Sequence, residues 1–131
     1  MAKGPLVDRL TEAGRRLIEF LDEAGLNTKS ALWLYRPESE DWELVVALPE
    51  AQENGPRAAY GKIWDVFAAH RSELLPLKLD DIVVMSPSDR LIRLLGSAIQ
   101  TGPSISEIRF TNNRVGDTLI EDALIYRVNT A

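Results

Sequence analysis

Residues 30–48 constrain the fold more than any other part of this chain. Their sequence is SALWLYRPESEDWELVVAL, in which two runs of aromatic and β-branched residues flank a polar break that contains Pro37. This pattern predicts a β-hairpin. A four-residue loop over residues 37–40 would give one face two tryptophans and a tyrosine, and would make much of the other face apolar as well. The predicted register pairs Tyr35 with Trp42, Trp33 with Leu44, Ala31 with Val46, Leu34 with Glu43 and Leu32 with Val45.

Length and composition predict a single globular domain over residues 1–131. Hydrophobic residues make up 45% and charged residues 27% of the chain, values typical of this class. The absence of cysteine excludes disulfides, thiolate nucleophiles and cysteine-ligated metals, and it fits a reducing compartment. The N-terminal residues carry no apolar signal-peptide core, and every apolar run is too short to span a bilayer. We therefore expect a cytoplasmic protein with no membrane partner.

The acidic residues are concentrated in one segment of the chain. The net charge of the whole sequence is −5. Residues 36–54 contain one arginine and six acidic residues, so this segment alone accounts for −5 and the remainder is neutral overall. Because nucleic-acid binding needs a basic face, we expect no nucleic-acid partner. The acidic segment fits a solvated hairpin tip and loop, or alternatively a docking surface for a basic partner.

Helices are predicted on both sides of the hairpin. Residues 5–24 show apolar positions three and four apart, and Gly25 followed by Leu26 predicts a Schellman ending. A polar loop is expected over residues 49–55, followed by a helix from Pro56 to about residue 72. The hairpin is therefore expected to stand between two amphipathic helices in the chain.

The second half of the chain alternates strands with one helix. The apolar run over residues 82–85 predicts a strand that is buried on both faces and hence central in the sheet. A helix is expected to begin with Ser86 as N-cap and Pro87 as first residue, and residues 106–111 and 118–128 predict a second pair of strands. The element order is then αββαβαββ. The expected fold class is α+β, a single domain with a five-stranded mainly antiparallel sheet and helices mostly on one face.

The opening of the chain resembles GAF-type sensor domains. In these domains a helix that ends at a glycine or a turn leads into a hairpin of the kind ALWLYRPESEDWELVVAL. The resemblance covers residues 15–48, and the helix expected between the middle strand and the last hairpin departs from the GAF order. The resemblance implies a sensor or ligand-binding fold.

The turn that leads from the strand at residues 82–85 into the next helix is a candidate small-ligand site. Backbone N–H groups at a helix start could bind a ligand together with the hydroxyls of Ser86 and Ser88. The side chains of Arg90 and Arg93 lie nearby in the sequence. The alternative is a helix whose own residues cap these donors. No glycine-rich phosphate loop occurs, so this candidate site depends on these residues alone.

Carboxylates on the last predicted strands form a second candidate site. Glu121 and Asp122 interrupt an apolar strand, and neighbouring strand residues point to opposite faces, so one of the two should point inward. An inward carboxylate needs a partner, for which Arg109 and Arg127 are the nearest candidates. The alternative is an acid cluster with Glu107, as in a carboxylate-metal hydrolase, although no lysine stands beside these acids.

The sequence offers no further catalytic constellation. His70 is the single histidine and lies near the end of the helix that begins at Pro56, where its charge would complement the helix dipole. The GxSxG nucleophile motif is absent, and one histidine without cysteine leaves only carboxylates to bind a metal. We therefore predict no catalytic residues, no cofactor and no metal site.

These observations lead to three hypotheses of function. The first is a non-catalytic protein-interaction or accessory module, and the others are a small-molecule sensor domain and a carboxylate-metal hydrolase. The helix that follows Pro87 has a wide apolar arc, and the second face of the hairpin is apolar too. Two such surfaces on a small domain predict a protein partner, or a homodimer that buries them.

Overall fold

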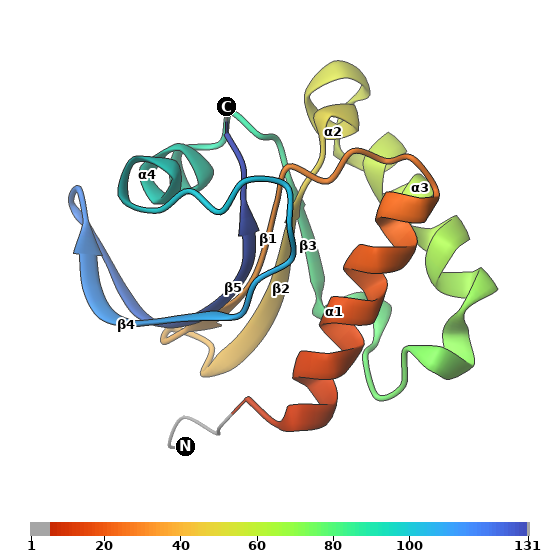
Figure 1. Cartoon of the computed structure of the whole chain (residues 1–131), viewed down its shortest axis with the longest axis horizontal. Helices are drawn as coiled ribbons and strands as arrows, with labels where there is room; N and C mark the ends of the chain where they lie inside the picture. Colours follow the sequence, from red (N-terminus) through yellow and green to blue (C-terminus); the bar gives the residue numbers. More distant parts are fainter. Residues whose placement is uncertain (1–5, 131) are drawn as a thin grey trace.

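The computed structural model describes residues 6–130 as a single α+β domain built on one five-stranded, mostly antiparallel sheet (Figure 1). The strand order is β3-β2-β1-β5-β4, in which the β2–β3 pair is parallel. The predicted fold class is therefore confirmed. The strands are β1 (Ser30–Arg36), β2 (Asp41–Ala47), β3 (Ile82–Met85), β4 (Ile108–Val115) and β5 (Thr118–Val128); the helices are α1 (Asp8–Glu23), α2 (Pro49–Asn54), α3 (Pro56–Ala69) and α4 (Arg90–Ala98).

The β1–β2 hairpin forms in the predicted register. All five predicted pairs are present, from Ala31 with Val46 to Tyr35 with Trp42, and residues 37–40 make the loop. β1 lies at the centre of the sheet, between β2 and β5. Its side chains are buried on both faces, so the hairpin contributes to two hydrophobic cores at once.

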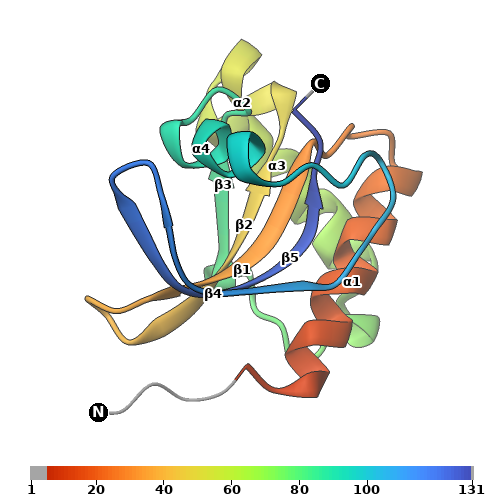
Figure 2. The ribbon, with the colours of Figure 1, turned by 60° about the vertical axis from the view of Figure 1, so that its left-hand side comes forward.

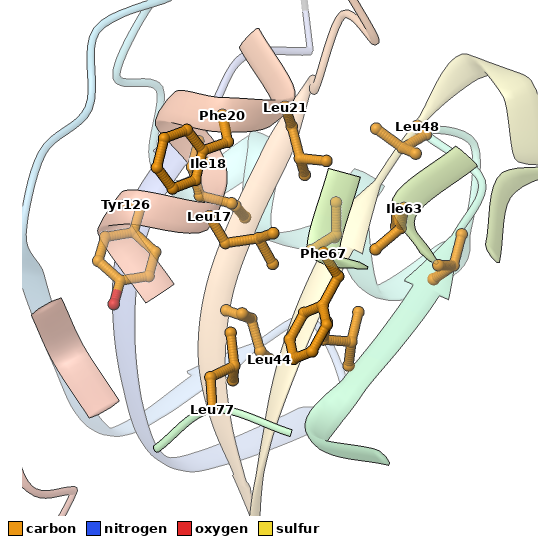
Figure 3. Close-up of a cluster of buried hydrophobic side chains, with 14 of the residues drawn as sticks. Leu17, Ile18, Phe20, Leu21, Leu44, Leu48, Ile63, Phe67, Leu77 and Tyr126 are labelled. Carbon is orange, nitrogen blue, oxygen red and sulfur yellow. The ribbon is translucent and has the colours of Figure 1, made fainter. Parts of the chain in front are cut away.

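Helix α1 packs together with α3 against one face of the sheet and forms the larger core (Figure 3). The helix ends as predicted, because Gly25 has a φ of 76° and the Leu26 N–H donates to the Leu21 carbonyl at 3.1 Å, as in a Schellman motif. Pro5, the predicted first-turn residue, lies outside the described residues. Side chains from two helices, two strands and the segment between α3 and β3 meet in this core: Leu17, Ile18, Phe20, Leu21, Leu44, Ile63, Phe67, Leu77 and Tyr126.

Gly14 lets α1 approach the sheet closely. The hydroxyl of Tyr126 accepts a hydrogen bond from Trp33 Nε1 at 3.0 Å and donates one to the Thr11 carbonyl of α1. A Cβ at Gly14 would lie 2.5 Å from that hydroxyl oxygen and 2.7 Å from the Trp33 nitrogen. The helix therefore rests directly on a buried Trp–Tyr pair, and burial raises the pKa of Tyr126.

Helix α4 covers the opposite face of the sheet (Figure 1). Its buried residues Ile92 and Leu95 belong to one cluster with Leu32 and Val45, which lie on the second face of the hairpin. The apolar arc of α4 and the second face of the hairpin, which led us to expect a homodimer from the sequence, therefore cover each other within one chain. The sequence-based argument for a homodimer therefore loses its support.

β3 is an edge strand, so the prediction that it is central in the sheet is wrong. It pairs with β2 on one side. On its other side the Tyr60 hydroxyl of α3 accepts the Val84 N–H at 3.1 Å and donates to the Ile82 carbonyl at 3.4 Å. A side chain thus takes the place of a neighbouring strand, which explains how a continuous apolar run can occupy the edge.

Two predicted boundaries in the middle and at the end of the chain also differ from the structure. Residues 49–54 form α2 instead of a polar loop, and the proline stands in the first turn, where a helix tolerates it. β4 runs over Ile108–Val115 rather than over residues 106–111. The last turn is therefore shorter than predicted and consists of residues 116–117, with a φ of 62° at Gly116.

The helices of this domain are short. α1 has 16 residues and α3 has 14. Within the described part of the chain, no helix has the length and apolar character needed to cross a membrane. α1 is instead amphipathic, since Leu17 and Leu21 are fully buried whereas Glu12 and Glu23 are exposed.

Candidate functional site

The candidate ligand turn between β3 and α4 caps itself. α4 begins at Arg90, later than predicted, because Asp89 is the N-cap and its carboxylate accepts the Leu91 N–H at 2.9 Å. The predicted N-cap, Ser86, precedes the helix, and its hydroxyl accepts the Ser88 N–H at 3.1 Å. The backbone donors that a ligand would need at these two positions are therefore already bonded within the chain.

Of the two arginines at this turn, Arg90 is bound to the β4–β5 hairpin. Its guanidinium pairs with Asp117 in the hairpin turn, and this hydrogen bond lowers the pKa of the Asp117 carboxyl. Arg93 lies exposed on α4. Arg90 is thus engaged with the hairpin and not with the two serines, so the structure does not gather the four predicted residues around one ligand position.

Two carboxylates of the predicted acid cluster are bound by different arginines. Asp122 is 5% exposed and accepts two hydrogen bonds from Arg109, with Nε–Oδ1 at 2.8 Å and Nη2–Oδ2 at 2.7 Å. Glu107 pairs with Arg15 of α1. The ion pair expected at an inward carboxylate is therefore present, with Arg109 and not Arg127 as the partner. Within residues 6–130, no group of three or more His, Cys, Asp or Glu residues is arranged to hold a metal ion.

Arg127 instead joins the sheet to the end of α1. Its guanidinium donates to the two Asp22 carboxylate oxygens at 3.0 and 2.8 Å, and to the Thr28 carbonyl at 3.0 Å. A hollow of about 220 Å³ opens beside this pair. The Nε of Arg127 and the hydroxyl of Thr28 are buried without a hydrogen-bond partner. Because Asp22 already balances the charge of Arg127, the hollow offers an anion no uncompensated cation.

A wider groove of about 350 Å³ lies between α1 and α3. It is lined by Phe20 and His70, whose rings stack with centroids 3.7 Å apart, and by the acidic residues Glu23 and Asp65. His70 lies at the C-terminal end of α3, as predicted, and its backbone N–H donates to the Phe67 carbonyl at 3.2 Å. Glu23 and Ala24 at the end of α1, and Ala69 and His70 at the end of α3, also line this groove.

The sheet divides between β1 and β5. These strands pair only as far as Leu34 with Ala123. Beyond that point, among the described residues, β1 continues through residues 35–36 with β2 alone, while residues 118–122 of β5 pair with β4 alone. Figure 2 shows the β1–β2 and β4–β5 hairpins diverging from this point. We call these two facing stretches, residues 35–36 of β1 and residues 118–122 of β5, the fork.

The β5 side of the fork carries backbone groups without a strand partner. Val115 and Thr118 flank a two-residue turn, and in such hairpins the flanking residues exchange backbone hydrogen bonds with each other. Successive strand residues alternate in the direction of these groups, so Leu119 and Glu121 direct N–H and C=O groups away from β4 and into the fork. An added strand binds to backbone groups of this kind.

A hollow of about 190 Å³ lies in the fork. Its apolar walls come from three elements, through Leu34 of β1, Leu91 of α4 and Ile120 of β5. Leu119 also lines it and is 56% exposed. The volume is comparable to the apolar cavity of about 150 Å³ that accommodates a benzene molecule, so the fork can accept one apolar side chain of a partner.

Carboxylates surround the fork. Glu38 lines the hollow itself. The pKa of the Tyr35 hydroxyl is raised, first by burial and then by nearby carboxylates, which are Glu121, Glu40 and Asp41. The fork therefore combines a hollow with apolar walls, backbone groups without a strand partner, and several nearby carboxylates.

The two outer edges of the sheet are protected against strand addition, in contrast to the fork. Tyr60 occupies the edge of β3. β4 presents exposed polar and charged side chains such as Arg114, and its backbone is irregular at Asn112, where φ is 47°. Charged side chains and irregular backbone at an edge hinder pairing with another chain. In the fork, by contrast, the apolar side chain of Leu119 is exposed and can contact a partner.

No protein-family model matches the chain, and neither a curated protein nor a solved structure matches it. The resemblance of residues 15–48 to GAF-type sensor domains therefore receives no support from these comparisons. The function has to be argued from the geometry of the fork and from its chemistry.

From the sequence, Glu121 is a candidate only within an acid cluster with Glu107 and Asp122, and neither Tyr35 nor Leu119 is a candidate site residue. The available signal was strand length, since β5 has 11 residues and β1 has seven. A long strand beside a short one leaves part of its edge unpaired. Which strands are neighbours is a tertiary property, and the pairing of β1 with β5 joins residues 89 to 98 positions apart in the sequence, from Leu34 with Ala123 to Ser30 with Val128.

Proposed function

We propose that the protein is a protein-interaction module that binds an extended segment of a partner protein in the fork. The observation that carries this proposal is the exposed Leu119 beside a hollow with apolar walls, on a stretch of β5 that has a neighbouring strand on one side only. Strand addition obtains affinity from backbone hydrogen bonds and specificity from pockets for side chains, and the fork supplies both features.

The other two hypotheses have weaker support. A sensor domain would use an enclosed pocket, whereas the hollow at Arg127 and the groove between α1 and α3 open to the surface. A carboxylate-metal hydrolase would use converging acids, whereas Glu107 and Asp122 are bound by separate arginines. Strand addition needs neither feature.

Selection of peptides from a random phage-displayed library on the immobilised chain tests the proposal. We expect selected peptides to bind Leu119→Gln about tenfold more weakly than the wild type, because the change removes an apolar contact beside the hollow. Leu75→Gln is the matched control, since Leu75 is 69% exposed on the connector between α3 and β3, and this variant should bind like the wild type.

Hydrogen exchange shows whether binding adds a strand. In the complex, the amides of Leu119 and Glu121 should exchange more slowly, because the partner's backbone would bond to them. A library that yields no binder, or peptides that bind Leu119→Gln as tightly as the wild type, would contradict the proposal.

A further inference from the structure

We infer that the segment bound in the fork is basic, with one apolar residue that enters the hollow and a lysine or arginine on each side of it. This inference rests on the function proposed above and adds the chemistry of the partner. Its evidence is the distribution of charge around the fork and the faces of the sheet on which these charges lie.

The β1–β2 side of the fork is acidic. The hairpin loop contributes Glu38 and Glu40, and β2 begins with Asp41. Among the described residues that line the hollow, Arg36 is the one cation, and its Nε donates to Glu43 at 2.9 Å. The charge of Arg36 is therefore already balanced by Glu43, whereas Glu38 brings a carboxylate to the lining of the hollow.

The β5 side of the fork adds a further carboxylate. This carboxylate is Glu121, which stands on the stretch of β5 that pairs with β4 alone and faces the fork. After burial, its charge is the largest cause that raises the pKa of Tyr35. Arg90, at the turn end of the fork, is paired with Asp117. Arg114 of β4 stands near the same turn. At the inner end, Arg109 lies over the Trp42 ring, on the face that carries Tyr35, and both carboxylate oxygens of Asp122 bind it. Arg36, Arg90 and Arg109 are thus each paired with a carboxylate, whereas Glu38 and Glu121 add negative charge to the fork.

The two faces of the sheet determine the spacing of the partner's residues. Leu34 belongs to the core under α4, whereas Tyr35 lies on the other face together with Trp42. Adjacent residues of a strand point to opposite faces. A partner residue that enters the hollow beside Leu34 would therefore have neighbours on both sides that point to the face of Tyr35. The negative charges of Glu121 and of the loop carboxylates raise the pKa of Tyr35, so their field extends to this face.

Lysine and arginine fit these flanking positions in two ways. Their charge complements the carboxylates, and their long apolar stems can lie over Tyr35 while the charged ends remain in water. Glutamate or aspartate at the same positions would face like charges, which is a common means of rejecting wrong partners. The expected recognition pattern is thus basic, apolar, basic.

Three synthetic peptides test this inference. They share one neutral, strand-forming sequence and differ only in a central Lys-Leu-Lys, Gln-Leu-Gln or Glu-Leu-Glu. We expect the lysine peptide to bind the wild type about tenfold more tightly than the glutamine peptide, and the glutamate peptide to bind more weakly than both. Raising the salt from about 0.1 M to about 1 M should remove this order, because the Debye length falls from about 10 Å to about 3 Å.

A charge reversal in the fork supplies the matched control. The double change Glu38→Lys with Glu121→Lys should make the glutamate peptide the tightest binder. Glu53→Lys reverses one exposed charge on α2, at the other end of the sheet, and should leave the order of the peptides unchanged (Figure 2).

The outcomes separate the inference from the proposed function. If the three peptides bind equally and all bind Leu119→Gln more weakly, the result supports the proposed strand addition and shows that the inference of a basic partner is wrong. If no peptide distinguishes the wild type from Leu119→Gln, the proposed function fails as well. A dimer that Leu119→Gln dissociates would make a second copy of the chain the occupant, and this result would also overturn the inference.

Discussion

At the scale of single residues, buried polar contacts fix α1 to the sheet at both of its ends. Near the start of the helix, Tyr126 links Trp33 of β1 to the Thr11 carbonyl. At the other end, Arg127 binds the Asp22 carboxylate. Arg127 is buried whereas Asp22 is 37% exposed, so the loss of Asp22 would leave a buried charge without its partner. α1 is therefore held in one orientation, which the close approach at Gly14 also requires.

Gly14→Ala should lower the free energy of unfolding although alanine is the better helix former. In an open helix position this change stabilises by up to about 1 kcal/mol. At Gly14 the new Cβ would lie 2.5 Å from Tyr126 Oη and 2.7 Å from Trp33 Nε1, and overpacking of this kind costs about 1–3 kcal/mol. Gly61→Ala in α3 is the matched control, because a Cβ there meets nothing within 4 Å, and it should stabilise the chain. Urea denaturation compares the two variants, and a gain at both positions would show that α1 has room at Gly14.

At the scale of secondary-structure elements, the sequence predicted what depends on local pattern. The hairpin register followed from the loop at residues 37–40, the end of α1 followed from Gly25, and the span of β5 followed from its apolar run. The position of β3 was not predictable in this way, because it depends on Tyr60, a residue of another element. The apolar arc of α4 was recognised, but only the fold shows that the second face of the hairpin covers it.

Tyr60→Phe should loosen the edge of β3 without unfolding the domain. The change removes the hydroxyl that accepts the Val84 N–H and donates to the Ile82 carbonyl. The loss of these bonds should lower the free energy of unfolding by about 0.5–1.5 kcal/mol. Hydrogen exchange at Val84 should accelerate, whereas Val46, in the neighbouring strand and inside the sheet, should be affected only through the global change in stability. An unchanged exchange rate at Val84 would show that the side chain does not cap this edge.

At the scale of the whole molecule, the fork follows from the placement of α4. The turn of the β4–β5 hairpin rests on this helix, because Arg90 pairs with Asp117 and a Cβ at Gly116 would lie 3.0 Å from Leu94. These contacts hold the distal end of the hairpin toward α4, whereas the loop of the β1–β2 hairpin lies away from α4 (Figure 2). The candidate site thus lies where two hairpins separate. Sequence reasoning could predict each hairpin but not the angle between them.

We expect the chain to be a monomer in solution, although its sequence alone suggests a homodimer. The apolar arc of α4 and the second face of the hairpin cover each other, and the outer edges of the sheet are occupied by Tyr60 or made irregular at Asn112. A second copy would also bring its own net charge of −5 to an acidic fork, and like charges oppose such an encounter. Size exclusion with light scattering should therefore give the mass of one chain, 14.6 kDa, across the concentration range. A mass twice as large that Leu119→Gln returns to one chain would show that the fork binds a second copy, because the exposed side chain at position 119 lies in the fork and outside both hydrophobic cores.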